Sequence, residues 1–589
     1  MKTETYEILP SKKKKAELGY KRAIVLHGLR KLLADLGGQG EMTFLFKNAY
    51  VPQEEYMESV LLTARTPELS ALTEEYNQTL KTAAAKGHNN YSRKMYLESG
   101  DGLEEILQED LKELYGYEAR RVIGKGRQAS RGSRPSKRLY LYNIPPDAAD
   151  TLFNDLLGVA ADSELVVRMQ PIEPHFAEEA LGTAGELQAG EGKQALPGRE
   201  KGKQAHRTGP AACLPSQEEN CFFRAATPVI KEAEETGEPL FLTEFCIFLY
   251  GENDEEVGRD AQLLATSALK YGGMVREGTG FAPRVFTAAQ VANMLPVNIH
   301  AAFETKPLLQ GTNPVNNSII LSDRGNAYIG LITGAVRSGK TAELKKEAVH
   351  SLLTTEDEIY VVTARSEEWE DVGESLVLEA AEKDEDYGLT RPADVMETVY
   401  RKAYEVMQLF AGKGKTGASP KAPLAGRRPA VGSQSPGTGK MGIVEVNNAE
   451  ELLLTIDNLW NKAIAAKKEN RGIQIFVDGI DAFFFAAETS DYLLAILSGC
   501  EVLHVPVTVT VQDAAAVCGD PDAAIEFECF LRTVTFAKLL NQGPVERRAL
   551  QEAFALPDAL IQGVADQMPG YGVLITPEKT VRFEAAGYV

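Results

Sequence analysis

Apolar positions recur along this chain with two different periods, and each period predicts one kind of element. Continuous or alternating apolar runs predict strands, whereas apolar residues spaced three and four apart predict helices. The predicted strands are residues 42–48, 138–143, 239–250, 328–332, 358–363, 473–477, 506–511, 534–539, 572–575 and 580–584. The predicted helical faces are Leu69, Leu72, Tyr76 and Leu80, then Val257, Ala261, Leu264 and Ala268, and later Leu344, Ala348 and Leu352.

The order of these elements predicts an α/β fold class. After residue 328, strands alternate with helices, which is typical of a mostly parallel sheet with both faces covered. The last two strands form a predicted hairpin around Pro577. Before residue 310, strands and helices are mixed, which indicates a preceding α+β domain.

Composition divides the chain further. Residues 178–220 are rich in Gly, Ala, Gln and Lys, and they predict a flexible insertion or linker. We therefore expect an N-terminal α+β domain in two parts, residues 1–177 and 221–309. A phosphate-binding domain is expected over 310–589, with a second flexible insertion near 411–441, which is rich in Gly, Pro and Lys.

Charge and cysteine content narrow the function classes. The net charge of −21 argues against bulk electrostatic binding of nucleic acid. Within the basic segment 120–138, a solvated loop and a weak contact with nucleic acid or acidic lipid both stay open. The apolar runs are too short to span a bilayer, no signal peptide is expected, and the scattered cysteines favour reduced thiols, so we expect a cytosolic protein.

The sequence GAVRSGKT matches the phosphate-binding pattern G-x-x-x-x-G-K-[ST], also called Walker A. It follows a predicted strand and precedes a predicted helix, which is the context that the pattern requires. Backbone N–H groups of such a loop surround phosphates, and the helix N-terminus adds to the attraction. The predicted nucleotide-binding residues are Gly334, Ala335, Val336, Arg337, Ser338, Gly339, Lys340 and Thr341.

Two of these residues have specific expected tasks. The Lys340 ammonium reaches the β- and γ-phosphates, and the Thr341 hydroxyl binds Mg²⁺. A second metal ligand is expected at the end of a neighbouring strand, where Asp478 follows the run IQIFV. The alternative for Asp478 is a plain strand-end cap. ATP and Mg²⁺ are therefore the predicted ligands.

The catalytic half of the site is less complete. A nucleotide hydrolase usually carries an acidic residue directly after the metal-binding aspartate, where it polarises the attacking water. Here that position is Gly479, so Asp481 and Glu368 are weighed as substitutes. Gln512 follows another strand and is a candidate for orienting water or sensing the γ-phosphate, or else it is an ordinary polar residue.

Arg547 and Arg548 are adjacent on a predicted helix. One of them, with Arg547 preferred, is a candidate arginine finger that reaches a neighbouring subunit. The alternative is that both are solvated, as adjacent arginines on a helix commonly are.

Several segments together resemble the VirB-four family, the TraC/TrsE-like conjugation ATPases of type IV secretion systems. The similarity is strong over residues 317–362 around the phosphate loop. It continues in VTVTVQDAAAV, which places Gln512 in the family's glutamine position, and in FAKLLNQGPVERRALQEAF, which places Asn541, Gln542, Glu546 and Arg547 on matching positions. The closing GYGVLI also resembles the family, whereas the similarity before residue 310 is weak.

This resemblance implies an N-terminal docking domain, a RecA-like motor domain, and homo-oligomers, usually hexamers. It also implies contact with inner-membrane channel components and a cytoplasmic location at the inner face of the cell membrane. The chain departs from the family at Gly479 and at residues 364–369, ARSEEW, where only the last glutamate, Glu368, and an aromatic residue remain.

The sequence consequently leaves three functions open. The first is an ATP-hydrolysing subunit that drives DNA or protein transfer in a conjugative secretion system. The second is a degenerate, non-hydrolysing subunit with a structural or regulatory role in the same machinery. The third is a DNA-translocating motor, against which the negative net charge counts.

Overall fold

The computed structural model of this protein divides into two compact units. Unit 1 comprises residues 1–56, 87–302 and 315–318, and unit 2 comprises residues 57–86, 303–314 and 319–589. The residues that the structure describes are 4–10, 22–36, 40–99, 117–122, 134–141, 144, 148–160, 162–177, 217–278, 284–296, 307–322, 327–376, 440–469, 471–479, 499–500, 503–512, 531, 533–562, 564, 569–576 and 579–585. Most of the two predicted insertions and Asp481 lie outside them.

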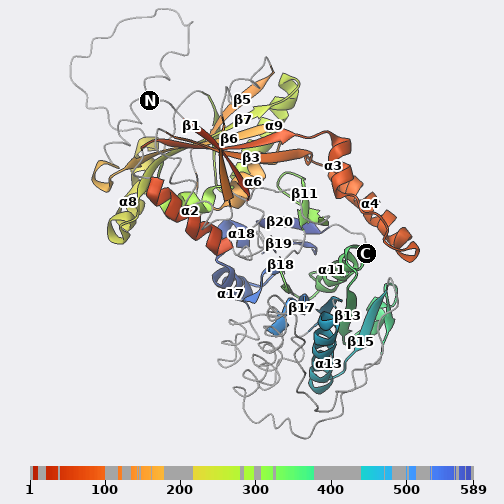
Figure 1. The fold of residues 1–589 in the computed structure, drawn as a ribbon. Coiled ribbons are helices and arrows are strands. Elements are labelled where there is room, and N and C mark those ends of the chain that lie inside the picture. Colours follow the sequence, from red (N-terminus) through yellow and green to blue (C-terminus); the bar gives the residue numbers. More distant parts are fainter. Residues whose placement is uncertain are drawn as a thin grey trace, which may run out of the picture. The chain divides into compact units, whose positions relative to one another are not determined.

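Unit 1 is built on one antiparallel sheet in the order β4-β1-β3-β2-β6-β7-β5-β8, with β9 paired to β7 (Figure 1). Helices α2, α6, α8, α9 and α10 accompany it. The strands are β1 (Glu4–Pro10), β2 (Met42–Tyr50), β3 (Tyr91–Ser99), β4 (Tyr117–Arg121), β5 (Ser136–Leu141), β6 (Ser163–Ile172), β7 (Leu240–Tyr250), β8 (Val275–Glu277) and β9 (Arg284–Thr287). The helices are α2 (Arg22–Leu36), α6 (Asp150–Leu157), α8 (Gln217–Thr236), α9 (Asp254–Leu269) and α10 (Ala288–Met294).

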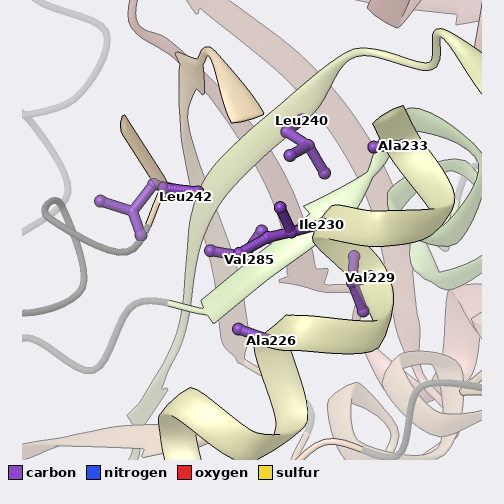
Figure 2. Packing of buried hydrophobic residues seen from close by; sticks show 8 residues of the cluster. Ala226, Val229, Ile230, Ala233, Leu240, Leu242 and Val285 are labelled. Carbon is purple, nitrogen blue, oxygen red and sulfur yellow. The ribbon is translucent and has the colours of Figure 1, made fainter. Parts of the chain in front are cut away.

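Apolar alternation along β7 explains how this sheet is buried. Phe245, Ile247 and Leu249 are almost fully buried on one face. Leu240 and Leu242 point to the other face, where α8 covers them together with Val285 of β9 (Figure 2). The helix contributes Ala226, Val229, Ile230 and Ala233 to this cluster. Because α8 begins at Gln217, the last residues of the expected insertion 178–220 are helical.

Unit 2 contains a mixed sheet in the order β11-β10-β20-β19-β18-β12-β17-β16-β13-β15-β14. From β18 to β14 neighbouring strands are parallel, whereas β11, β10, β20, β19 and β18 are joined by antiparallel pairings. The strands are β10 (Leu308–Thr312), β11 (Ile319–Ser322), β12 (Ile329–Thr333), β13 (Glu358–Thr363), β14 (Gly373–Ser375), β15 (Met441–Glu445), β16 (Ile473–Val477), β17 (Val507–Val511), β18 (Phe536–Leu540), β19 (Tyr571–Ile575) and β20 (Thr580–Ala585). The α/β class is confirmed; among the described strands of this sheet, six pairings are parallel and four are antiparallel.

In unit 2, the helices α11, α13 and α17 each follow a parallel strand, namely β12, β15 and β18. The sheet packs against α11, which contacts β12, β13, β16 and β17, and against α13, which contacts β16 (Figure 1). The described helical segments are α4 (Ser70–Ala84), α11 (Lys340–Thr354), α13 (Ala449–Lys468), α17 (Pro544–Phe554) and α18 (Asp558–Gln562), with short turns η1 (Pro67–Leu69) and η3 (Ser366–Trp369). Helix α3 (Gln53–Val60) and turn η2 (Pro174–Phe176) are also among the described helical segments.

Residues 57–86 differ from the expected division, which placed them in the N-terminal domain. They cluster with unit 2 because α4 packs there. Tyr76 forms an edge-on ring contact with His350 of α11, and its hydroxyl accepts a hydrogen bond of 2.9 Å from the Leu309 N–H of β10. Burial raises the pKa of the Tyr76 hydroxyl to about 12.

A buried charge cluster ties α11 to β18. The Lys538 ammonium lies 2.6 Å from Glu343 and 2.7 Å from Glu347, and Lys346 lies 2.5 Å from Glu343. All four side chains are almost inaccessible to solvent. Burial opposes ionisation of Glu343, but Lys538 and Lys346 outweigh it and lower the pKa of this carboxyl. The cluster fixes the helix that follows the phosphate-binding pattern.

Among the helices of the described part, none combines the length and the apolar character that a membrane span requires.

Candidate functional site

The predicted phosphate-binding loop connects β12 to α11, and its sequence explains its sharp turns. A Cβ atom at Gly334 would lie 2.3 Å from the Ser338 hydroxyl, so only glycine fits there. Gly339 has a φ of 101°, in the left-handed region that glycine adopts without strain. Arg337 also has a positive φ, 65°, which costs energy for a residue with a Cβ atom.

Lys340 begins α11 and turns back over this loop. Its ammonium donates hydrogen bonds to the carbonyl oxygens of Gly334 at 2.7 Å and Ala335 at 3.0 Å. The charge is therefore held above the loop backbone, where the pattern expects a phosphate. The Ala335 N–H donates to the Asn541 carbonyl at 2.7 Å, and the Gln542 amide donates to the Thr333 hydroxyl at 3.1 Å, so the segment after β18 supports the loop.

Asp478 lies at the carboxyl end of β16, and the structure corrects its expected placement. We expected β12 and β16 to be neighbours, but β17 lies between them. The two ends nevertheless converge, because the Thr341 hydroxyl donates to Asp478 Oδ1 at 3.4 Å. The Thr510 hydroxyl of β17 donates to the same oxygen at 2.8 Å, so the intervening strand bridges the gap.

The environment of Asp478 suits a bound cation. Burial raises the pKa of its carboxyl, the Thr510 and Thr341 hydroxyls lower it, the negative charge of Glu368 raises it, and Arg365 lowers it. The net direction is upward, chiefly because the carboxyl is buried. Hydroxyl and carboxylate oxygens are ligands that Mg²⁺ prefers. Thr341 and Asp478 therefore fit the ion that the sequence analysis expects.

Gly479 leaves the position after Asp478 without a side chain. Its N–H donates to the Thr510 hydroxyl at 2.6 Å, and its φ is 72°. A Cβ atom there would meet no described atom within 4 Å. The backbone conformation favours glycine, and none of the described residues occupies the space beside it.

Glu368 is the candidate acid that the structure brings near Asp478. It belongs to η3, which follows β13, and β13 is the direct neighbour of β16. Arg365 donates to the Glu368 carboxylate at 2.9 Å. Sequence reasoning assigned no role to Arg365 or Thr510, because nothing in the local pattern marks an arginine after a strand or a threonine within one.

Gln512 and Arg547 occupy different surroundings. Gln512 follows β17 at the same sheet edge as the loop, because β17 pairs in parallel with both β12 and β16. Its side chain is exposed. Arg547 lies on α17 and donates to the Gly543 carbonyl of its own helix at 3.3 Å. The proposed role of each residue stays a prediction.

Comparison with known proteins gives only distant matches. No protein family matches the sequence, and no curated protein matches it. Among solved structures, VirB4 of Thermoanaerobacter pseudethanolicus is similar at 11% identity and a TM-score of 0.35, over 47% of this chain and 96% of that one.

Two further structures are similar. The cytoplasmic domain of the Type VII secretion ATPase EccC of Thermomonospora curvata matches at 11% identity and a TM-score of 0.29, over 58% of this chain and 33% of that one. The genome packaging NTPase B204 of Sulfolobus turreted icosahedral virus 2, in complex with ATP-gammaS, matches at 9% identity and a TM-score of 0.26, over 44% of this chain and 99% of that one. VirB4 bears the name of the family that the sequence resembles.

Proposed function

We propose that unit 2 is a RecA-like P-loop domain that binds ATP with Mg²⁺ and hydrolyses it. The observation that carries this proposal is the convergence of Lys340, Thr341 and Asp478, which come from two separated segments of the chain. The lysine ammonium and the loop N–H groups would bind the phosphates of ATP. Thr341 and Asp478 would hold Mg²⁺, which neutralises charge on the phosphate oxygens when bound.

Hydrolysis in this proposal is attack of water on the γ-phosphorus. The water oxygen forms a bond to phosphorus, the bond to the bridging oxygen breaks, and its electron pair leaves with ADP. Glu368 accepts the proton of the attacking water, and Gln512 orients that water. Arg547 from a second copy of this chain stabilises the charge that develops on the phosphoryl group.

The wider role that we propose is a motor-type subunit of a conjugative type IV secretion system. The supporting evidence is the resemblance of residues 317–362, 507–517 and 536–554 to the TraC/TrsE-like family. In this role the chain forms homo-oligomers, which are usually hexamers in that family. It works at the inner face of the cell membrane with channel components.

A second candidate is a nucleotide-binding subunit that does not turn over ATP. Gly479 favours this alternative, because the residue that usually follows the metal-binding aspartate is absent. The remaining candidate, a DNA-translocating motor, depends on the basic segment 120–138, of which residues 123–133 lie outside the described part.

Phosphate release and nucleotide binding by the purified full-length chain separate these candidates. Release that requires Mg²⁺ and is lost in Lys340→Ala supports the hydrolase. Binding of ATP that depends on Lys340, without phosphate release, selects the non-hydrolysing subunit. If neither binding nor release depends on Lys340, the P-loop proposal is wrong. Salt-dependent binding of DNA would favour the translocating motor.

A further inference from the structure

An exposed ion pair stands at the carboxyl end of β13. Arg365 and Glu368 are joined at 2.9 Å, and their side chains are 69% and 36% exposed. Ion pairs this accessible contribute little to stability, typically about 0–1 kcal/mol. The fold therefore does not depend on this pair.

The backbone around the pair is nevertheless firmly held. The Arg365 N–H donates to the Thr363 hydroxyl at 3.1 Å, and the fully buried Trp369 anchors the end of η3. Lys345 of α11 donates to the Glu368 carbonyl at 3.3 Å and lies 2.7 Å from Asp371. Two exposed charged side chains thus project from a turn that is fastened to the helix of the phosphate-binding loop.

The pair also lies within electrostatic reach of Asp478. The Asp478 N–H donates to the Val362 carbonyl at 2.8 Å, which places Asp478 beside the end of β13. The carboxylates of Glu368, Asp478 and Glu367 raise the pKa of the Arg365 guanidinium. A guanidinium among three carboxylates, on the metal side of the proposed phosphate site, is positioned to exchange one anionic partner for another.

We propose that Arg365 is a positioning residue that detects the γ-phosphate of ATP and controls access to Glu368. This inference rests on the proposed function. Without nucleotide, Arg365 holds the Glu368 carboxylate. The γ-phosphate presents several anionic oxygens to a guanidinium, which binds phosphate as readily as carboxylate. Arg365 then moves to the γ-phosphate, and Glu368 is released to accept the proton of the attacking water. ADP lacks the γ-phosphate and leaves the pair intact.

If Arg365 exchanges Glu368 for the γ-phosphate, replacing Arg365 and replacing Glu368 should change the affinity for an ATP analogue in opposite directions. Arg365→Gln removes the γ-phosphate contact, so we expect about a tenfold loss of affinity for a non-hydrolysable ATP analogue, because a charge-assisted hydrogen bond is lost. Glu368→Gln frees Arg365 from its competing partner, so affinity for the analogue should rise about threefold or more, while phosphate release falls. Neither variant should change ADP affinity more than about twofold. Arg365→Lys should recover part of the loss, since it keeps the charge.

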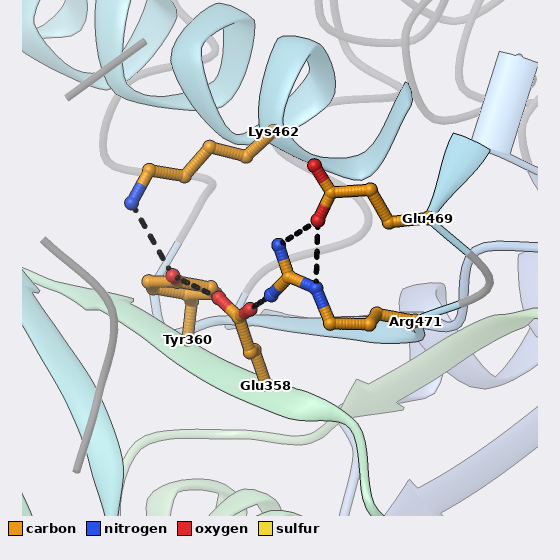
Figure 3. Close-up of polar contacts among 5 residues, drawn as sticks. All are labelled: Glu358, Tyr360, Lys462, Glu469 and Arg471. Carbon is orange, nitrogen blue, oxygen red and sulfur yellow. Dashed lines mark hydrogen bonds and ion pairs between the residues drawn. The ribbon is translucent and has the colours of Figure 1, made fainter. Parts of the chain in front are cut away.

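A matched control lies at the other end of the same sheet. Figure 3 shows Arg471 paired with Glu358, the first residue of β13, and with Glu469. Like Arg365, Arg471 is an exposed arginine in an ion pair, with a side chain that is about half exposed. Unlike Arg365, it lies away from the carboxyl ends of the strands. Arg471→Gln should leave both nucleotide affinities unchanged, which separates a local role of Arg365 from a general effect of lost charge.

Isothermal titration of each variant with ADP and with the ATP analogue, in the presence of Mg²⁺, tests the inference. A changed ratio of the two dissociation constants, with opposite directions in Arg365→Gln and Glu368→Gln, supports it. If the wild type binds the analogue in a Lys340-dependent manner but both variants keep the wild-type ratio, the inference is overturned and the proposed function stands. If Lys340→Ala binds as well as the wild type, the proposed function itself fails.

Discussion

Replacing Lys538 by methionine should destabilise unit 2 strongly, although Lys538 touches no part of the proposed nucleotide site. The four charges of Glu343, Glu347, Lys346 and Lys538 cancel, and all four side chains are at most 4% exposed. Without Lys538, the cluster carries one uncompensated buried negative charge. Removing one member of a buried ion pair costs about 3–5 kcal/mol, which is a large part of the 5–15 kcal/mol that typically holds a domain folded.

Tryptophan fluorescence during denaturant unfolding measures this effect selectively. The two tryptophans of the chain, Trp369 and Trp460, are both buried and both belong to unit 2. Adding Glu347→Leu to Lys538→Met restores neutrality, so the double variant should recover at least about 2 kcal/mol relative to Lys538→Met alone. Arg548→Met, which breaks an exposed ion pair with Glu552, is the control and should cost under about 0.5 kcal/mol.

The reasoning behind this prediction can be refuted directly. A loss below about 1 kcal/mol in Lys538→Met would mean that the cluster does not hold buried charges in solution. Strictly additive effects of Lys538→Met and Glu347→Leu would mean that the two groups do not interact. Either result would remove the charge cluster from the account of how α11 is fixed.

Three further predictions concern unit 2. Burial, together with Lys538 and Lys346, holds the pKa of His350 well below its ordinary 6.5. The folded state therefore binds fewer protons, and stability should fall as pH drops below 6.5, by up to about 1.4 kcal/mol per pH unit, with a shallower slope in His350→Gln. Gly334→Ala should lower the unfolding free energy by about 1–3 kcal/mol, because its methyl group would overlap the Ser338 hydroxyl, and a denaturant midpoint equal to the wild type would contradict this. Gly479→Glu should increase Lys340-dependent phosphate release, since none of the described residues would lie within 4 Å of the new Cβ atom, and Gly479→Ala controls for the strain of its positive φ; equal release by both variants would count against the idea.

Short apolar strands were predictable because their ends are marked by polar residues. Glu358–Thr363 and Ile473–Val477 have the bounds that the sequence predicts. The strand order was not predictable, because the pattern of apolar residues does not say which strands pair. The expectation that β16 lies beside β12 was wrong for this reason, since β17 lies between them. The antiparallel strands β10 and β11 were not predicted; in β10, which reads LLQGT, glutamine, glycine and threonine interrupt the apolar run.

The residues of the candidate site were also predictable only in part. The loop residues and Asp478 were found because a spacing pattern and a strand end mark them. Thr510 was missed because it lies within an apolar strand, and only the parallel register beside β16 brings its hydroxyl to Asp478. Arg365 was missed for a related reason, since its pairing with Glu368 and its closeness to Asp478 depend on how η3 folds back.

Titration of the chain with ATP, with and without Mg²⁺, tests most directly whether Lys340 and Asp478 form one site. We predict that Mg²⁺ strengthens binding to the wild type, that Asp478→Asn binds ATP equally with and without Mg²⁺, and that Lys340→Ala loses binding under both conditions. An Asp478→Asn variant that keeps the full Mg²⁺ dependence of the wild type would contradict the account.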